Sequence, residues 1–83
     1  MEGLTFSTWL YTRYEGTSPD KHMAIEEFLQ IVEGVLSFDE DNWKEVQRRL
    51  DLSGFNVTIN QGFIDFNGTP LSVQKIIDKY ETD

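Results

Sequence analysis

The sequence predicts a small α+β domain in which three helices precede a β-hairpin and one helix follows it (ααα-ββ-α), with the hairpin packed on the helices. Apolar residues recur at helical spacing through residues 4–52 and again through residues 73–80. Residues 55–66 instead alternate apolar and polar side chains, which is the two-residue period of a strand. Because the 83 residues contain no internal repeat or linker, we expect one compact domain over residues 1–83.

The first helix is expected over residues 4–14, with Thr5 or Gly3 as its N-cap. Gly16 is placed to follow its C-terminus, where glycine is favoured. The helical spacing of its apolar residues predicts a buried stripe of Phe6, Trp9 and Leu10. Tyr11 lies off that stripe, so it is a candidate for contact with a partner.

The second helix is expected to open at Ser18-Pro19, because serine favours the N-cap and proline favours the first helical position. Its apolar residues cover so much of its circumference that we expect it to be the central helix, contacted from two sides. Gly34 weakens its last turn by about 1 kcal/mol relative to alanine. The wide apolar face consists of Met23, Ala24, Phe28, Ile31, Val32 and Val35.

The third helix is expected over residues 38–52, because Ser37 and Glu40 fit the capping-box pattern Ser-x-x-Glu. Its helical spacing predicts a buried stripe of Trp43, Val46 and Leu50. Two acid-first pairs at i,i+4 spacing support it, Glu40 with Lys44 and Glu45 with Arg49. Its basic residues form either a solvated face laced with ion pairs or a small patch for an acidic partner; they are Lys44, Arg48 and Arg49.

The hairpin is expected to turn at Gln61-Gly62, because glycine tolerates the positive φ of a tight turn. A two-residue loop pairs Asn60 with Phe63, Ile59 with Ile64 and Val57 with Phe66. A three-residue loop would pair Ile59 with Phe63 and Val57 with Asp65, which places a carboxylate on the apolar face. We prefer the first register, because a slip of one residue moves every side chain to the other face.

Phe63 points to the polar face of the hairpin in the preferred register, beside Thr58 and Asp65. Its ring needs a neighbour: a helix edge of the same chain, a second copy of the chain or a partner protein. The candidate partner-binding residues are therefore Phe63, Thr58 and Asp65, together with Tyr11, Lys44 and Arg48. A second copy that pairs with the exposed edge of the hairpin would make a homo-oligomer.

The last helix is expected to begin at Thr69-Pro70, by the same cap and first-position preferences, after Asn67-Gly68 turns the chain. The spacing of its apolar residues predicts one buried face. That face consists of Val73, Ile76, Ile77 and Tyr80.

Composition narrows the classes of partner. Seven Lys and Arg against fifteen Asp and Glu give a net charge of −8, which repels phosphates, so we expect no nucleic-acid partner. Cysteine is absent, so the chain has no disulfide and no Cys-based zinc site. No apolar stretch reaches membrane-spanning length, and residues 1–4 lack the basic start of a signal peptide. We therefore expect a cytoplasmic protein with no membrane partner.

No motif in the sequence points to catalysis. Residues 39–42 (DEDN) lack the glycine and the final glutamate of a calcium loop, and they fit the first turn of a helix instead. His22 is the single histidine, and the neighbouring Ser18 and Asp20 fit cap and first-turn roles rather than a nucleophile and an orienting acid. We expect no catalytic residue, cofactor or metal site.

Two short runs resemble known families. Residues 26–32 (EEFLQIV) resemble the opening of the acidic four-helix immunity proteins that inhibit colicin nucleases, and Phe6-x-x-Trp9-Leu10 resembles small helical domains of Gram-positive bacteria and their phages. The hairpin departs from the all-helical immunity fold, so no site residue is carried over. Size, acidity and the absence of catalytic motifs favour a non-enzymatic protein–protein interaction module, of a bacterial, phage or mobile-element accessory type. The alternative is an acidic inhibitor of a nucleic-acid enzyme, either a nucleic-acid mimic or immunity-like.

Overall fold

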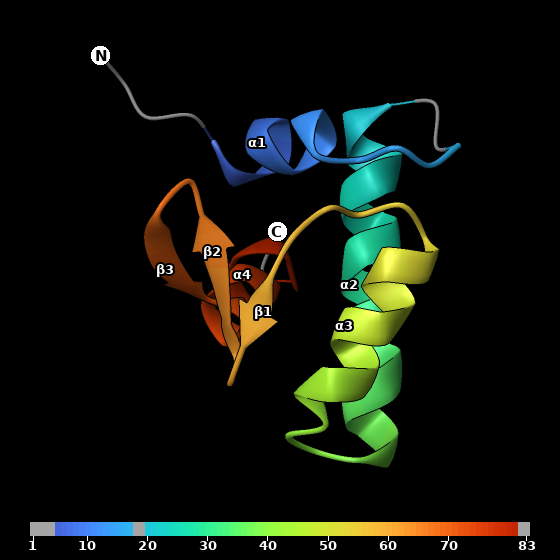
Figure 1. The fold of residues 1–83 in the computed structure, drawn as a ribbon, viewed down its shortest axis with the longest axis vertical. Helices are drawn as coiled ribbons and strands as arrows, with labels where there is room; N and C mark the ends of the chain where they lie inside the picture. Colours follow the sequence, from blue (N-terminus) through green and yellow to red (C-terminus); the bar gives the residue numbers. More distant parts are fainter. Residues whose placement is uncertain (1–4, 18–19, 82–83) are drawn as a thin grey trace.

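The computed structural model describes residues 5–17 and 20–81. Within these residues the chain forms four helices and one three-stranded antiparallel sheet with the strand order β1-β2-β3, which confirms the α+β class (Figure 1). One strand beyond the predicted hairpin is present. In chain order the elements are α1 (Phe6–Thr12), α2 (Lys21–Phe38), α3 (Trp43–Leu52), β1 (Ile59–Asn60), β2 (Phe63–Phe66), β3 (Thr69–Ser72) and α4 (Val73–Glu81).

The helices and the sheet lie side by side. In Figure 1, α1 crosses the end of the long helix α2, α3 runs beside α2, and α4 lies behind the sheet. The main contacts join α1 to α2, α2 to α3, α3 to β1 and α4 to β3. The sheet thus packs on helices, as expected: α4 contacts β3, and α3 contacts β1.

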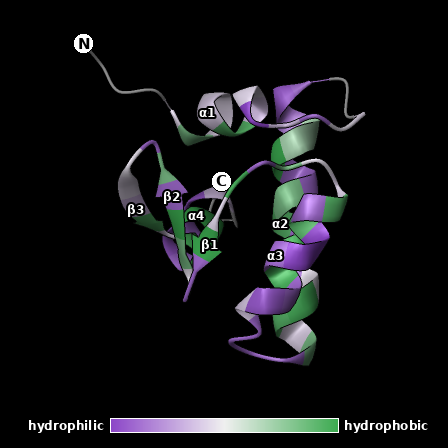
Figure 2. Cartoon of the chain, viewed as in Figure 1, coloured by the Kyte–Doolittle hydropathy of each residue, from purple (hydrophilic) through white to green (hydrophobic). Residues whose placement is uncertain are grey.

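One continuous hydrophobic core joins these elements, and it contains most of the predicted apolar residues of the four helices. The prediction for Met23 is wrong, because it lies in the first turn of α2 and is 48% exposed. Phe66 on β2 lies edge-on to Trp9 of α1, with ring centroids 5.1 Å apart. Figure 2 shows hydrophobic segments along α2 and a largely hydrophilic exposed side of α3. The buried residues are Phe6, Trp9, Leu10, Ala24, Ile25, Phe28, Val32, Val35, Val46, Leu50, Phe55, Val57, Ile59, Ile64, Val73, Ile76 and Ile77.

Thr5, one of the two predicted N-caps, caps helix α1, because its hydroxyl accepts a hydrogen bond from the Thr8 N–H. The helix therefore begins at Phe6, two residues after the expected Leu4. It ends at Thr12, two residues before the expected Tyr14. The chain leaves the helix because Tyr14 bridges to Phe55 in antiparallel fashion, with the two rings 4.6 Å apart. This bridge ties the end of α1 to the segment that leads from α3 into the sheet.

The boundary between α2 and α3 differs from the prediction. Helix α2 continues through Phe38, and α3 begins at Trp43 with Asn42 as its N-cap, whose side chain accepts from the Glu45 N–H at 3.2 Å. Ser37 is therefore no N-cap; its hydroxyl donates back to the Gly34 carbonyl within α2. Because Glu40 lies between the helices, its predicted helical pairing with Lys44 is wrong.

Helix α2 begins at Lys21, within the described residues. Asp20 is its N-cap, and its carboxylate accepts from the Met23 N–H at 3.0 Å. The expected Ser18-Pro19 cap falls on residues that the structure does not describe.

The sheet confirms the preferred register: Ile59 pairs with Ile64 and Asn60 with Phe63. One further hydrogen bond runs from the Asp65 N–H to the Thr58 carbonyl, so the pairing stops short of Val57. A second two-residue turn, with φ of 53° at Asn67 and 89° at Gly68, leads into β3. The prediction that Thr69-Pro70 begins the last helix is wrong, because Pro70 lies in an edge strand, where its missing N–H is tolerated.

Candidate functional site

The outer face of the sheet carries the residues that the alternation pointed away from the core. Asn60 on β1, Phe63 on β2 and Ser72 on β3 form one row across the three strands, because Phe63 pairs with both of the others. The next row holds Asp65, which pairs with Pro70, and Thr58, whose carbonyl accepts from the Asp65 N–H. Ile64, between Phe63 and Asp65, points inward and is fully buried. We call the six outward residues the outer sheet face: Thr58, Asn60, Phe63, Asp65, Pro70 and Ser72.

Phe63 is the aromatic residue of the outer sheet face, and it is exposed. Half of it (50%) is exposed, whereas the neighbouring Ile64 is 0% exposed. Its cross-strand neighbours, Asn60 and Ser72, are small polar residues, and among the described residues no aromatic ring or cation contacts it. The predicted outward position of Phe63 is thus confirmed, and its role in binding a partner stays a prediction.

A hollow of about 440 Å³ lies over this face. It brings together three of the predicted partner-binding residues, Phe63, Thr58 and Asp65. Its other lining residues are Asn60, Gln61, Ile64 and Pro70. Three predicted residues thus line one hollow, whereas Pro70 was not among the predicted residues because Thr69-Pro70 fits the start of a helix.

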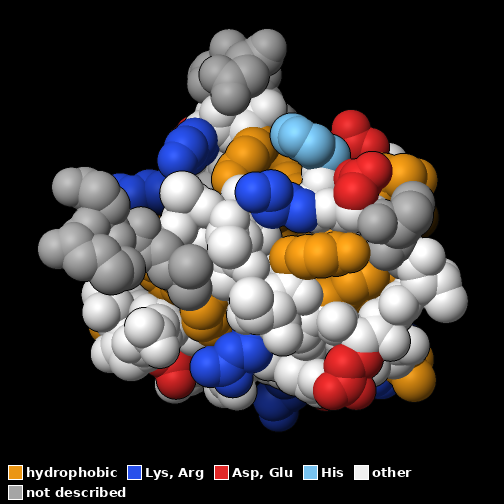
Figure 3. Space-filling model, turned by 90° about the horizontal axis from the view of Figure 1, so that it is seen from above, with side chains coloured by type: hydrophobic (Ala, Val, Ile, Leu, Met, Phe, Trp, Pro, Cys, Tyr) orange, Lys and Arg blue, Asp and Glu red, His pale blue; other side chains and the backbone are white. Residues whose placement is uncertain are grey.

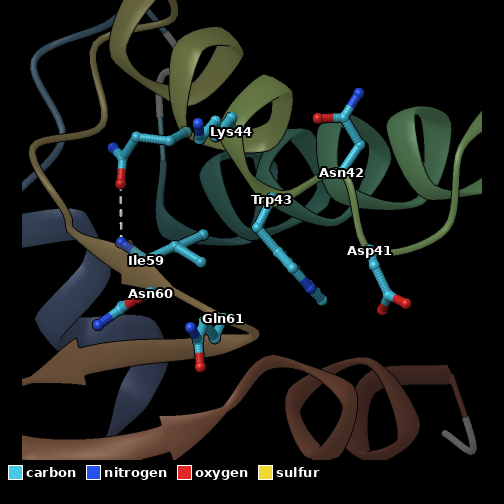
Figure 4. A pocket seen from close by; sticks show the side chains of 8 residues that line it. Asp41, Asn42, Trp43, Lys44, Ile59, Asn60 and Gln61 are labelled. Atoms are coloured by element: carbon cyan, nitrogen blue, oxygen red, sulfur yellow. Dashed lines mark hydrogen bonds between the residues drawn. The ribbon is translucent and has the colours of Figure 1, made fainter.

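A second groove, of about 530 Å³, lies between the start of α3 and the β1–β2 turn (Figure 4). Asn60 and Gln61 line both hollows, so the two form one continuous surface around the turn. Lys44, another predicted residue, lines this second groove, and in Figure 4 Trp43 points from α3 toward the turn. The remaining lining residues are Asp41, Asn42, Gln47 and Ile59.

The Gln47 side chain joins α3 to the segment at β1 through hydrogen bonds to backbone groups, as a neighbouring strand would. Its side-chain oxygen accepts from the Ile59 N–H at 2.7 Å, and its side-chain nitrogen donates to the Val57 carbonyl at 2.8 Å (the first bond is dashed in Figure 4). These are backbone groups on the edge of β1 that a further strand would need. The other edge strand, β3, contains Pro70, which offers no N–H. A homo-oligomer through a sheet edge stays a prediction, and these features of both edges oppose it.

The β1–β2 turn holds an unfavourable residue at the junction of the two hollows. Gln61 has a φ of 52° and Gly62 a φ of 88°, which is the pattern of a type I′ turn. Asparagine, aspartate or glycine is favoured at the first of these positions, and a left-handed conformation costs other residues about 1–2 kcal/mol. Glycine is favoured at position 62, because a φ of 88° strains other residues and an added Cβ would lie 3.3 Å from the Trp43 ring. Gln61 therefore departs from the residue preference of a type I′ turn, and it lines both hollows.

The last two predicted residues, Tyr11 and Arg48, line neither hollow. Tyr11 is 38% exposed and stacks on Tyr14 of the same helical end, with ring centroids 6.4 Å apart. Arg48 grips the Glu45 carboxylate with two hydrogen bonds, from Nε at 2.9 Å and from a terminal nitrogen at 2.6 Å.

The ion pairs on α3 decide between the two readings of its basic residues. The two hydrogen bonds from Arg48, and then the one from Arg49, lower the pKa of Glu45 to about 2. The same contact raises the pKa of Arg48. Two of the three basic residues are therefore engaged with one carboxylate of their own helix, which favours the solvated face laced with ion pairs. Figure 3 shows both basic and acidic side chains on the face that it views, with the basic ones distributed over several places.

The single histidine and the acidic side chains are the residues on which a metal site would depend. His22 is exposed near the start of α2. Across residues 5–17 and 20–81, no three His, Asp or Glu side chains come together as a metal site would require. Likewise, no helix in the described part of the chain is long and apolar enough to cross a membrane.

Comparison with known proteins adds no relative. No family model, curated protein or solved structure is significantly similar to this chain. The two short resemblances, at residues 26–32 and at Phe6-x-x-Trp9-Leu10, are thus unsupported by a family match.

Proposed function

We propose that this chain is a non-enzymatic protein–protein interaction module that binds another protein through the outer sheet face, as a small bacterial, phage or mobile-element accessory protein would. The observation that carries the proposal is Phe63, a half-exposed aromatic residue in a hollow on a face that no helix covers. Aromatic side chains are enriched among the residues that contribute most to protein–protein binding. A solvated ring in such a position gains free energy when a partner covers it.

The turn beside Phe63 supports the same surface. Gln61 keeps a left-handed conformation that glycine or asparagine would adopt with less strain. Residues that break a local rule in this way concentrate at functional sites. Because Gln61 and Asn60 line both hollows, a partner seated on Phe63 also reaches the amide side chains of the turn.

Affinity capture from an extract of the source organism tests the proposal, with Phe63→Ser compared to wild type. We expect partners to be lost by the variant while its cooperative unfolding transition is retained. The matched control is Phe38→Ser, because Phe38 is 95% exposed at the end of α2 and lines neither hollow. Equal capture by wild type and Phe63→Ser, or equal loss in the two variants, contradicts binding through the outer sheet face.

One observation favours the alternative, an acidic inhibitor that mimics nucleic acid or acts like an immunity protein. Three consecutive exposed carboxylates, at residues 39–41, lie in the loop between α2 and α3 beside the exposed Phe38. A mimic of this kind binds its enzyme where the phosphates bind, so excess DNA releases it. Capture that survives excess DNA and depends on Phe63 favours the module; capture that DNA abolishes and that depends on residues 39–41 favours the inhibitor.

A further inference from the structure

Phe63 and Asp65 lie two residues apart on the same face of β2, in the same hollow. The Asp65 carboxylate accepts one hydrogen bond, from the Gly68 N–H at 2.9 Å, through Oδ1. Among the described residues no Lys or Arg pairs with Asp65, and no cation stacks on Phe63. An aromatic face and an unpaired carboxylate thus stand side by side and exposed.

The three arginines of the chain contact other side chains, although Arg13 also lines a hollow of about 140 Å³ that Asp65 borders. Arg48 and Arg49 are paired with Glu45, Arg13 lies over the Trp9 ring at 5.3 Å, and Lys79 lies over Tyr80. With a net charge of −8, the chain attracts positive and repels negative partners. The charge of the molecule and the chemistry of the hollow therefore favour the same kind of occupant.

We propose that the outer sheet face binds a cationic segment of a partner protein, with an arginine of that segment stacked on Phe63 and paired with Asp65. The proposal rests on the proposed function and names the chemistry of its partner. A guanidinium group is planar and weakly hydrated, so it stacks on an aromatic ring and donates two parallel hydrogen bonds to a carboxylate. Both contacts are available together because the two side chains leave the same face of one strand.

The segment is expected to cross the face rather than extend the sheet. Gln47 already occupies the outward N–H of Ile59 on β1 and the carbonyl of Val57, which precedes β1. Pro70 interrupts the donors of β3. The polar side chains around Phe63 are free to bond with the segment's backbone; they are Thr58, Asn60 and Gln61.

NMR titration of the full chain with short capped peptides tests the proposal. The probe is a Gly/Ser peptide carrying spaced arginines, and its matched versions carry citrulline, leucine or glutamate at the same positions. At low salt we expect backbone amide shifts centred on residues 58–65 with the arginine peptide. Citrulline keeps the shape of arginine without its charge. We expect the citrulline peptide to bind at least roughly threefold more weakly than the arginine peptide.

Variants separate the site from general charge attraction. Asp65→Asn retains the oxygen that accepts from Gly68 and removes the charge, and we expect it to weaken the arginine peptide roughly threefold. Phe63→Ser is expected to weaken it to a similar extent by removing the stacking surface. Glu26→Gln is the matched control, because it removes one exposed charge on α2, outside the outer sheet face. It should change the affinity less than twofold.

Each other outcome overturns the proposal. Equal weakening by Asp65→Asn and Glu26→Gln shows non-specific attraction. If the leucine peptide binds as tightly as the arginine peptide, the partner is apolar. That result rejects the arginine site and does not contradict the proposed function. A dimer in analytical ultracentrifugation that Phe63→Ser dissolves shows that a second copy is the occupant. Absence of shifts at residues 58–65 with every peptide rejects the arginine site, while Phe63-dependent capture decides the proposed function separately.

Discussion

Replacing Gln47 by alanine should destabilise the protein far more than its partial exposure suggests. The side chain joins α3 to the edge of β1 through two hydrogen bonds, to the Ile59 N–H and to the Val57 carbonyl, and it also donates to Asp51 at 2.9 Å. Strand β1 has two residues and pairs with β2 on one side. On its other side, the Gln47 side-chain amide makes the hydrogen bonds that a neighbouring strand would otherwise make. Alanine leaves both backbone groups without a protein partner in a partly buried site.

The expected loss follows from these bonds. A neutral hydrogen bond contributes about 0.5–1.5 kcal/mol, and a buried backbone group left unpaired costs about 1–3 kcal/mol. Partial access of water reduces the second figure, so the two bonds together predict a loss of about 2–3 kcal/mol. Domains of this size lose roughly 4–8 °C in Tm for each kcal/mol, which predicts a fall of about 10–20 °C.

Urea denaturation and amide hydrogen exchange measure this effect. Gln74→Ala is the matched control, because Gln74 on α4 donates to Asp78 at i+4, as Gln47 does to Asp51, with no bond to a strand. It should lose at most about 0.5 kcal/mol, and the Ile59 amide should lose its protection in Gln47→Ala alone. If Gln47→Ala costs no more than Gln74→Ala and Ile59 stays protected, the strand-like role of Gln47 is refuted.

Three further changes test the local structure. Gly34→Ala should stabilise α2 by about 1 kcal/mol, because nothing lies within 4 Å of the added Cβ; an unchanged or lower urea midpoint would contradict this. Gln61→Gly should raise stability by roughly 0.5–1 kcal/mol by relieving the left-handed residue, while weakening any partner that contacts the turn. The Glu45 carboxyl should titrate in NMR near its pKa of about 2, below the ordinary 4.5, and Arg48→Gln should move it upward. Because this pKa is lowered by folding, its contribution to stability is present above about pH 4.5 and is lost as the pH falls toward 2.

The register of the hairpin was predictable because two independent constraints agree. Gly62 in a two-residue turn fixes the pairing of Asn60 with Phe63, and the same pairing keeps Asp65 off the apolar face. Phe63 was therefore placed correctly on the exposed side. The core stripes of the helices were predictable for a related reason, since helical spacing depends on short-range geometry.

The third strand was not predictable from the same kind of local signal. Thr69-Pro70 satisfies the preferences of a helix start and of an edge strand equally well, and what decides is the second tight turn at Asn67-Gly68, which returns the chain to β2. The prediction of where α3 begins was wrong for a similar reason. Ser37-x-x-Glu40 and Asn42-x-x-Glu45 both fit an N-terminal cap, and the structure uses the second. Gln47 left no local signal at all, because its bonds reach residues ten and twelve positions away.

The most direct test of the outer sheet face is the free energy of unfolding of Phe63→Ser beside that of Ile64→Ala. Phe63 is half exposed and Ile64 is fully buried on the opposite face. We expect Phe63→Ser to lose about 1 kcal/mol, for the half of the ring that is covered, and Ile64→Ala to lose about 2–5 kcal/mol. If Phe63→Ser loses as much as Ile64→Ala, Phe63 is a core residue and the outer sheet face is no binding surface.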